Sequence, residues 1–281
     1  MDIALNGQSR LAITGEAAYV TFPAWNVPGY VHYGYSSRML GDSKGIYAAM
    51  NLGFNRGDDH ETVFNNYRKM TAALGIGVSN LVLPKQTHSL NVKKVTKTDC
   101  GNGIERANAY EDIDALMTDE NGVALMVFTA DCVPVFLFDP VKRVIALAHA
   151  GWRGTVGGIC RNTLHAMKCE YGSEPKDVIA AIGPSICREC FEIGPEVAEE
   201  FLQAFPEEKD EVLFAGKGDR SFADLWKANE IMLLREGVLR ENITVSGLCT
   251  MCRPQMFFSH RATAGKRGSN AGFLMLGEVS E

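Results

Sequence analysis

The stretch from Ala124 to Thr155 constrains the fold of this chain more than any other. It contains three short apolar runs, which span residues 124–130, 133–138 and 144–148. The last two runs are separated by Asp139-Pro140-Val141-Lys142, which has the composition of a turn. Runs of this length separated by a turn are typical of buried strands. We therefore predict an antiparallel hairpin at the centre of the fold.

The register of this hairpin places two ligand-type side chains together. If the turn closes directly, Phe138 faces Arg143, and further along the ladder Cys132 faces His149. Directly opposed residues have Cβ atoms about 4.5–5.5 Å apart, which allows a thiolate and an imidazole to reach the same small cation. Pro134 lacks the N–H that a central strand uses, so we expect it at an edge or a bulge.

Apart from this stretch, apolar spacing gives a coarse secondary structure. Three- and four-residue spacing predicts a helix after Asp58 or Asp59 that stops at Gly75, and further helices at about 155–171, from Pro195, and at 225–239. Short apolar segments predict strands at 11–14, 19–22, 81–83, 91–95, 114–118, 178–182 and 245–248. Helices and strands thus alternate irregularly along the chain.

Composition narrows the class of protein. A chain of 281 residues suits one large domain or two small ones, and the lack of repeats and low-complexity linkers favours a single domain over residues 1–281. A net charge of −6 argues against nucleic acid or an anionic membrane as the main partner. No apolar run approaches the ~20 residues that span a bilayer, and the N-terminus lacks a signal-peptide pattern. We expect a cytoplasmic protein, monomeric or homodimeric, whose eight cysteines are thiols or metal ligands rather than disulfides.

The first candidate site consists of His88, Cys132 and His149. Two imidazoles and one thiolate form a common zinc set, and three protein ligands leave a fourth position for water, as in catalytic sites. Only Cys132 and His149 are related by the hairpin register. His88 joins them by inference, and the alternative for it is a hydrogen-bonded structural role. The same pair also suits nucleophilic catalysis, in which a histidine lowers the pKa of the Cys132 thiol.

A second candidate site consists of two Cys-x-x-Cys pairs. Cys187 and Cys190 form one pair, and Cys249 and Cys252 form the other. Two such pairs can form a closed four-thiolate zinc site, although the spacer is much longer than in a zinc ribbon. A redox pair and ordinary packed thiols are the alternatives, and the sequence leaves the three open.

The segment after His149 suggests an anion site. Gly151, Arg153 and Gly154 lie between the third apolar run and a helical pattern. A strand, a glycine-containing turn and a helix start together present free backbone N–H groups, which favour an anion. With Arg153 inside the turn, phosphate is a candidate ligand. The alternative is that Trp152 packs and Arg153 is a solvated surface residue.

A series of motifs gives this chain a resemblance to a known family. NLGFNRGDD, PKQTHS, DALMT, TADCVPVFLFDP, AHAGWRGT, IGPSI and FFSHRA occur in this order across nearly the whole chain. Together they resemble the laccase-domain, YfiH-like family. That family was first described as multicopper polyphenol oxidases, and is also regarded as purine nucleoside phosphorylases with adenosine deaminase and methylthioadenosine phosphorylase activity.

The resemblance implies a fold and a ligand set. It implies a single-domain α+β sandwich with mixed sheets flanked by helices, related to bacterial deamidating toxins that use a Cys–His pair. It also implies that the metal ligands are His88, Cys132 and His149, the trio chosen above. This chain departs from the family pattern near its end, where residues 266–269 read Lys-Arg-Gly-Ser and relatives often read Thr-Gly-Arg.

Chemistry favours one of the implied activities. A multicopper oxidase needs many histidine ligands, and this chain has six histidines in total. Zinc, with copper as the alternative metal, suits hydrolytic deamination because it lowers the pKa of bound water to about 7. Phosphorolysis needs a cationic cradle and an acid for the departing purine, for which Asp131 is the candidate. The candidates for binding substrate or phosphate are Arg56, Lys85, Gln86 and Arg153.

We therefore predict a zinc-dependent purine nucleoside enzyme that phosphorolyses adenosine, inosine and methylthioadenosine and deaminates adenosine. Its partners would be purine nucleosides and phosphate, with no nucleic acid and no membrane. Three alternatives stay open. The first is a cysteine hydrolase or amidase acting on cell-wall precursors with Cys132 as nucleophile, and the second is a copper-dependent polyphenol oxidase. The third is a metal-binding or partner-binding protein whose activities are incidental.

Overall fold

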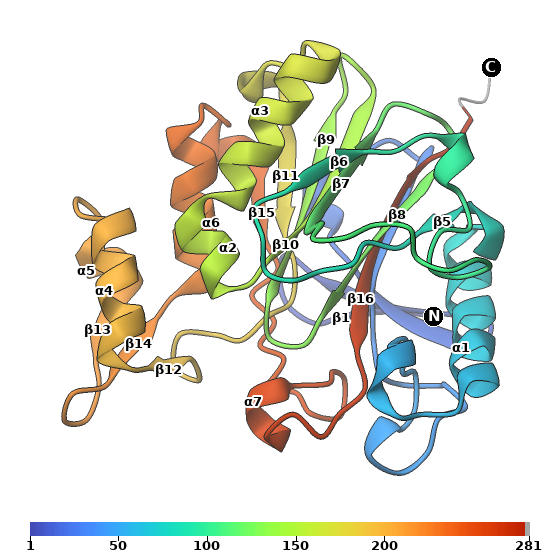
Figure 1. The fold of residues 1–281 in the computed structure, drawn as a ribbon, viewed down its shortest axis with the longest axis horizontal. Coiled ribbons are helices and arrows are strands. Elements are labelled where there is room, and N and C mark those ends of the chain that lie inside the picture. Colours follow the sequence, from blue (N-terminus) through green and yellow to red (C-terminus); the bar gives the residue numbers. More distant parts are fainter. Residues whose placement is uncertain (279–281) are drawn as a thin grey trace.

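Two mixed β-sheets lie face to face between helices in the computed structural model, which describes residues 1–278 (Figure 1). Helix α1 (His60–Leu74) covers the outer face of one sheet, and α3 (Ile159–Tyr171) and α6 (Leu225–Arg235) cover the outer face of the other. The predicted α+β sandwich with mixed sheets and flanking helices is confirmed. Among the described residues, no helix combines the length and apolarity needed to cross a bilayer.

The larger sheet has seven strands within residues 1–278, in the order β1-β2-β3-β4-β16-β8-β5. Neighbouring strands run antiparallel except β5 and β8, which are parallel. The strands are β1 (Asp2–Ala4), β2 (Arg10–Thr14), β3 (Ala17–Thr21), β4 (Val31–Ser36), β5 (Leu81–Val82), β8 (Ala124–Thr129) and β16 (Asn270–Leu276). The C-terminal strand β16 thus lies between strands from the first half of the chain.

The second sheet has six strands, in the order β15-β11-β9-β10-β7-β6. Its two outer pairs, β15–β11 and β7–β6, are parallel, and the remaining pairs are antiparallel. The strands are β6 (Val92–Lys94), β7 (Ala115–Thr118), β9 (Val133–Asp139), β10 (Val144–Ala150), β11 (Ile179–Ile182) and β15 (Ile243–Val245). The predicted hairpin, β9 and β10, forms the middle of this sheet.

A small sheet and short helices complete the described chain. The small sheet has the order β12-β14-β13 and lies with α4 and α5 at one end of the molecule (Figure 1). Its strands are β12 (Glu192–Ile193), β13 (Leu213–Ala215) and β14 (Ser221–Ala223). The remaining helices are α2 (Trp152–Gly157), α4 (Pro195–Ala204), α5 (Lys209–Val212) and α7 (His260–Thr263).

Alternation along the central hairpin explains why two cores meet at one sheet. Every residue of β9 and β10 is buried. Successive side chains of a strand point to opposite faces, so Val135 and Leu137 pack under α3, whereas Phe136 and Phe138 pack between the two sheets. A strand buried on both faces reads as a continuous apolar run, which is the pattern seen in the sequence.

The hairpin register differs from the prediction. Asp139 pairs with Val144, and the four residues between them form the loop. Asp139 accepts hydrogen bonds from the N–H groups of Val141 and Lys142 at 2.8 and 2.9 Å, and Arg143 has a φ of 54°. The loop therefore includes Arg143 and excludes Asp139, one residue further along the chain than predicted. The register is therefore shifted by two, and His149 faces Pro134 instead of Cys132.

Two further predictions about this region were wrong. Pro134 lies in a central strand rather than at an edge or bulge. The pairing of β9 with β11 ends at Val135, so at Pro134 the strand is paired only with β10. The helix expected over about 155–171 is two helices, because α2 begins at Trp152 and Gly158 breaks the run with a φ of 87°. Arg153 is therefore inside α2 and not in a turn before it.

Candidate active site

Three ligand-type side chains converge at one end of the six-stranded sheet. His88 lies in the loop between β5 and β6, Cys132 in the turn between β8 and β9, and His149 near the end of β10. One nitrogen or sulfur atom of each lies within 4.8 Å of those of the other two. The Sγ atom of Cys132 is 3.9 Å from Nε2 of His88, and the two imidazole centroids are 4.9 Å apart. The structure therefore brings together the trio chosen from the sequence.

Local backbone geometry explains how Cys132 reaches the histidines without facing His149 in the ladder. Asp131 has a φ of 83°, so the chain turns sharply just before Cys132. Gly151 provides the room opposite this turn. A Cβ atom on Gly151 would lie 2.6 Å from Cδ2 of His88 and 3.1 Å from Sγ of Cys132. A glycine is therefore needed here for the close approach of the chain to the site.

Asp114 supports both histidines, and the sequence analysis assigned it no role. Its buried carboxylate accepts a hydrogen bond from Nδ1 of His149 at 2.7 Å. It also accepts from the N–H groups of Thr87, His88 and Ser89, at 3.0, 3.2 and 2.8 Å. These bonds fix the loop that carries His88 and leave Nε2 of His149 free. The only signal in the sequence is an acidic residue directly before a buried strand.

The charges of this group reinforce one another. Burial opposes ionisation of the Cys132 thiol, but the positive charge and hydrogen bond of His149, together with His88, outweigh it and lower the pKa of Cys132 to about 6. Burial also opposes protonation of His149, yet Cys132 and Asp114 raise the pKa of His149 to about 9. Asp114 is buried as well, but the bond from His149 lowers its pKa to about 2. In the protein without metal, a thiolate and an imidazolium are the favoured forms.

A cavity of about 570 Å³ opens next to the trio. His88 and Cys132 line one side of it, and an apolar part includes Trp152, Ile186 and Phe191. Its volume falls within the range of about 300–1,000 Å³ that is usual for small-molecule sites. Three arginines, Arg56, Arg261 and Arg267, line the same cavity together with His260 and the two carboxylates of Asp131 and Glu192. The space therefore combines an apolar surface, a metal-type ligand set and positive charge.

Arg267 is the most constrained of these cations. Only 8% of it is exposed, its Nη1 donates to the Gly268 carbonyl at 2.9 Å, and its Nε has no protein partner. Burial lowers its pKa to about 10, and the positive charge of Arg56 contributes to this shift. Two guanidinium groups that repel each other in a partly closed cavity favour an anion between them. In the sequence, Arg267 is distinguished only as part of the departure from the family pattern at residues 266–269.

Asp131 lies beside the trio but is occupied by structural contacts. Its carboxylate accepts hydrogen bonds from Oγ1 of Thr250 at 2.6 Å, Oγ of Ser259 at 3.0 Å and the N–H of Arg261 at 2.7 Å. Asp131 thus holds the start of α7 against the turn that carries Cys132, and its geometry fits positioning better than proton donation.

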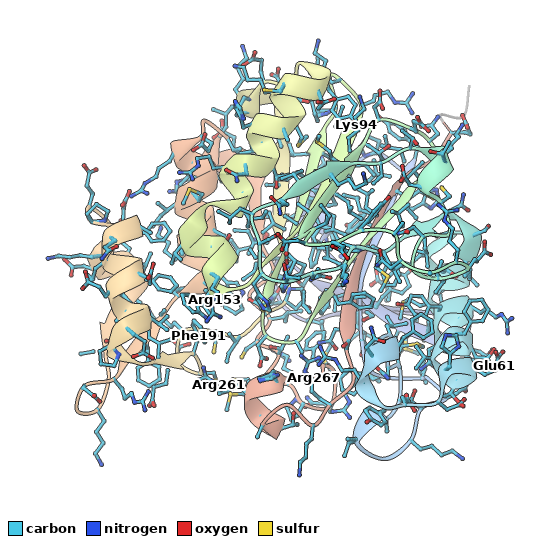
Figure 2. All side chains as sticks on the ribbon, viewed as in Figure 1. Glu61, Lys94, Arg153, Phe191, Arg261 and Arg267 are labelled. Carbon is cyan, nitrogen blue, oxygen red and sulfur yellow. The ribbon has the colours of Figure 1, made fainter. Side chains whose placement is uncertain are left out.

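The other predicted binding residues lie outside this cavity. Arg153 stacks on its neighbour Trp152, with 4.3 Å from the guanidinium carbon to the ring centroid, and faces a separate depression beside α4. Lys85 is exposed and 3.9 Å from Glu111. Gln86 bonds both the N–H and the carbonyl of Phe128 through its side chain. Figure 2 shows Arg261 on α7 and Arg267 beside this helix, whereas Arg153 lies on α2.

The donor set of the trio fits a zinc ion. Zinc binds thiolate sulfur at about 2.3 Å and imidazole nitrogen at about 2.0–2.1 Å, so a tetrahedral ion separates the two ligand atoms by about 3.6 Å. The separation of 3.9 Å between Cys132 and His88 requires only a small adjustment. The Asp114 bond to Nδ1 of His149 is the usual outer support of a metal-bound histidine. Nε2 of His149 is then the nitrogen that would face the ion.

This combination of fold and site defines a laccase-like α+β protein with a Cys-His₂ centre. Residues 32–277 match the family model described as Multi-copper polyphenol oxidoreductase laccase, and the chain belongs to that family. The resemblance identified from the sequence motifs is thereby confirmed.

Proteins similar to this chain carry enzyme names. It is 36% identical over 242 residues to Purine nucleoside phosphorylase YlmD of Geobacillus stearothermophilus, which covers 86% of this chain and 88% of that protein. It is 37% identical over 237 residues to Adenosine deaminase RL5 of an unknown prokaryotic organism, covering 84% and 88%. The crystal structure of YfiH from Bacillus licheniformis superposes with a TM-score of 0.88 at 30% identity, covering 95% and 98%. These names confirm the prediction that the chain belongs to a family of enzymes.

Proposed function

We propose that this protein is a zinc-dependent purine nucleoside enzyme. It cleaves adenosine, inosine and methylthioadenosine with phosphate and deaminates adenosine with water. The observation that carries the proposal is that a Cys-His₂ ligand set borders, through His88 and Cys132, the cavity that Arg56 and the buried Arg267 also line. The names of the relatives, purine nucleoside phosphorylase and adenosine deaminase, support the same pair of activities.

In this proposal, the trio binds the ion, and Asp114 positions the two histidines of the trio. Cys132 supplies a sulfur ligand whose pKa of about 6 favours the thiolate at neutral pH, and His88 and His149 supply nitrogens. Zinc bound by three such ligands supplies Lewis acidity and lowers the pKa of a coordinated water to about 7. Asp114 fixes the tautomer of His149 by accepting a hydrogen bond from Nδ1–H.

The rest of the cavity binds the substrates. Arg56 and Arg267 bind the phosphate, because an anion between them relieves their mutual repulsion. Phe191 and Trp152 provide apolar surface for the purine and sugar. A purine joined to a ribose-like sugar is common to all three nucleosides, so one cavity serves them. Phosphate enters from the cationic side and replaces water as the second substrate.

Product analysis by chromatography, with and without phosphate, tests this proposal. Inosine should release its base only with phosphate and yield ribose 1-phosphate, whereas adenosine deamination should need only water. Arg56→Ala should reduce phosphorolysis at least ~10-fold more than deamination, because it removes a charged hydrogen-bonding partner of the anion. Arg153→Ala is the matched control, since Arg153 lies outside the cavity. A selective loss of phosphorolysis in Arg153→Ala would instead show that phosphate binds at the start of α2.

A cysteine hydrolase is the second candidate, and one observation favours it. Cys132, His149 and Asp114 form a thiolate–imidazolium–carboxylate series, with 2.7 Å between Nδ1 of His149 and the Asp114 carboxylate. This order of groups also activates a cysteine nucleophile. Amide hydrolysis by metal-free protein that added zinc suppresses, with no turnover of any nucleoside by the metal-loaded protein, would support the hydrolase instead.

Copper-dependent oxidation of polyphenols has weaker support. Within the described residues, the trio is the histidine-containing cluster with metal-ligand spacing, and it offers ligands for one ion. Multicopper oxidation needs several copper ions with many histidine ligands. The thiolate and imidazole ligands accept copper as well as zinc, so metal analysis must precede the activity screen.

A further inference from the structure

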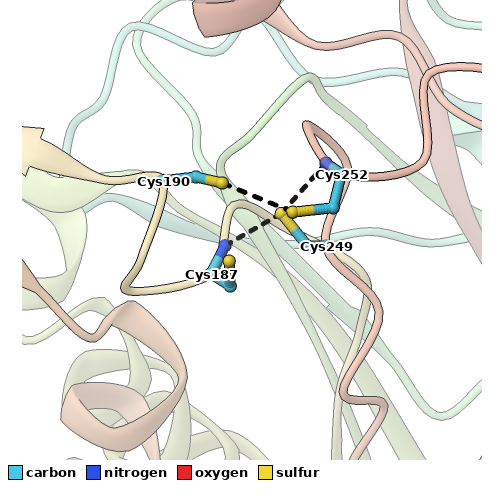
Figure 3. Close-up of side chains that lie close together, drawn as sticks. All are labelled: Cys187, Cys190, Cys249 and Cys252. Atoms are coloured by element: carbon cyan, nitrogen blue, oxygen red, sulfur yellow. Dashed lines mark hydrogen bonds between the residues drawn. The ribbon is translucent and has the colours of Figure 1, made fainter.

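The two Cys-x-x-Cys pairs, far apart in the sequence, meet in space. Cys187 and Cys190 lie in the loop between β11 and β12, and Cys249 and Cys252 lie in the loop after β15. Their sulfur atoms all lie within 4.8 Å of one another. Figure 3 shows the two loops presenting the four side chains to each other. The function proposed above uses none of these residues.

The spacing of the sulfur atoms fits a tetrahedral metal ion. With zinc–sulfur bonds of about 2.3 Å, the sulfurs of a four-thiolate site are about 3.8 Å apart. The Sγ atoms of Cys190 and Cys252 are 3.4 Å apart, and no pair in the cluster exceeds 4.8 Å. Small side-chain movements would therefore bring all four sulfurs onto one ion.

Backbone hydrogen bonds favour a thiolate at the centre of the cluster. The N–H groups of Cys187 and Cys252 both donate to Sγ of Cys249, at 3.3 and 3.4 Å. Donation from the fourth residue of a Cys-x-x-Cys pair to its first sulfur stabilises an ionised ligand. A redox pair needs only two thiols, and packed thiols need no donors, so neither alternative accounts for the whole arrangement. The burial of Cys187 and Cys249 also suits a closed site, in which Cys252 is the ligand on the exposed side.

We propose that Cys187, Cys190, Cys249 and Cys252 bind one zinc ion in a closed, four-thiolate structural site. This site is separate from the trio and takes no part in the chemistry. It uses four protein ligands and leaves no position for water, which is the arrangement of structural zinc.

The position of the cluster shows what the ion would stabilise. Between the two loops, Ser185 donates to the Leu248 carbonyl at 3.2 Å and accepts from the Thr250 N–H at 3.0 Å. From these loops, Ile186 donates to the Asp131 carbonyl at 3.0 Å, and Thr250 bonds the Asp131 carboxylate at 2.6 Å. Ile186 and Phe191 line the active-site cavity. The ion would therefore fix one wall of the cavity by joining two irregular loops.

Metal analysis of the full chain tests the proposal without reference to activity. Wild-type protein should contain about two zinc ions per chain, one per site. Cys190→Ser with Cys252→Ser should retain about one, and Cys132→Ala should also retain about one, held by the four cysteines. Cys169→Ser changes an exposed cysteine outside both clusters and should retain both ions. A zinc content unchanged in the double variant, or absent from Cys132→Ala, would overturn the four-cysteine site.

Cobalt substitution gives an answer even where the double variant does not fold. Cobalt in Cys132→Ala protein should show the strong sulfur-to-metal charge-transfer bands of a tetrahedral four-thiolate site. The same protein should lose these bands as four thiols react with a thiol reagent and release one ion. Weak bands with fewer than four protected thiols would overturn the proposal, as would a Cys190–Cys252 disulfide found by mass spectrometry in metal-loaded protein. Cys132→Ala lacks a ligand of the trio, so the cobalt bands report on the four-cysteine site alone. A failure of the proposed nucleoside activity would therefore leave this result unchanged.

Discussion

At the residue scale, the trio depends on a position that supplies no ligand. Gly151 has a φ of −66° and a ψ of 172°, which alanine adopts readily, so Gly151→Ala should fold. Its new Cβ atom would contact His88 at 2.6 Å and Cys132 at 3.1 Å. We expect zinc affinity at the trio to fall on the order of 10–100-fold, the usual cost of disturbing the support of a metal ligand. Competition with a chromophoric chelator measures it.

Gly154→Ala is the control for this prediction. Gly154 lies in α2, which begins directly after Gly151, and its Cβ atom would meet nothing closer than 3.4 Å, an ordinary contact. It should therefore bind zinc as the wild type does. If both variants kept wild-type affinity, the close packing around the trio would have no effect on metal binding.

The charge state of Cys132 makes a second prediction, for metal-free protein. Burial raises the pKa of the thiol, but His149 and His88 outweigh it and bring the pKa to about 6. The thiolate is the reactive form, so alkylation of Cys132 should accelerate as pH rises through 6 and level off near 7. Mass spectrometry after short exposure to iodoacetamide gives the rate at each pH, with the exposed Cys169 as the internal reference.

His149→Ala supplies the comparison for this profile. Removal of its positive charge should shift the midpoint for Cys132 to higher pH, since burial then dominates. A midpoint above 8 in the wild type would contradict the thiolate assignment. Added zinc should suppress the reaction, because coordination occupies the sulfur.

The sequence predicted residues that carry distinctive chemistry and missed those defined by long-range contact. His88, Cys132 and His149 stand in motifs, and they meet in the structure although the register that first linked two of them was wrong. Asp114 and Arg267 were not assigned roles, because an acid before a strand or an arginine in a glycine-rich segment is common in any chain. Their roles arise only when the cavity closes around them.

At the scale of elements, apolar spacing predicted which segments are helices or strands but not how they end. The four-residue hairpin loop lies one residue further along the chain than predicted because Asp139 caps it from the end of β9, which a sequence pattern of turn formers does not specify. The apolar stripe of residues 155–171 continues across Gly158, so spacing alone suggested one helix. The break follows from the left-handed conformation of Gly158, which ends α2 and separates it from α3.

This break gives the third prediction. Gly158→Ala should lower the free energy of unfolding by about 1–2 kcal/mol, since a left-handed conformation costs an L-residue roughly that amount. Its Cβ atom would meet only the guanidinium end of Arg161, at 3.0 Å, which can move away. Urea denaturation measures the change. Gly29→Ala, at an open position, should change it by less than about 0.5 kcal/mol. An equal effect in both variants would show that the break is unimportant for stability.

At the scale of the whole molecule, the central hairpin couples the layers. Its alternate residues enter the core between the sheets and the core beneath α3, so neither core can form without β9 and β10. The C-terminal strand β16 pairs with β4 and β8, which closes the larger sheet only when the whole chain is present. The prediction of a single domain from the lack of linkers therefore implies that the layers unfold together.

This coupling gives the last prediction. Phe136 is fully buried between the sheets, and its ring centroid lies 5.5 Å from that of Phe22. Leu164 is buried on α3, in the other core. Phe136→Ala should cost about 3–5 kcal/mol and Leu164→Ala about 2–5 kcal/mol. Both should move one common urea transition, followed by tryptophan fluorescence and by circular dichroism. Val141→Ala, on the exposed hairpin loop, should leave it within about 0.5 kcal/mol. Separate transitions for the two probes would divide the chain into two domains, because a shared sheet cannot lose one core and keep the other.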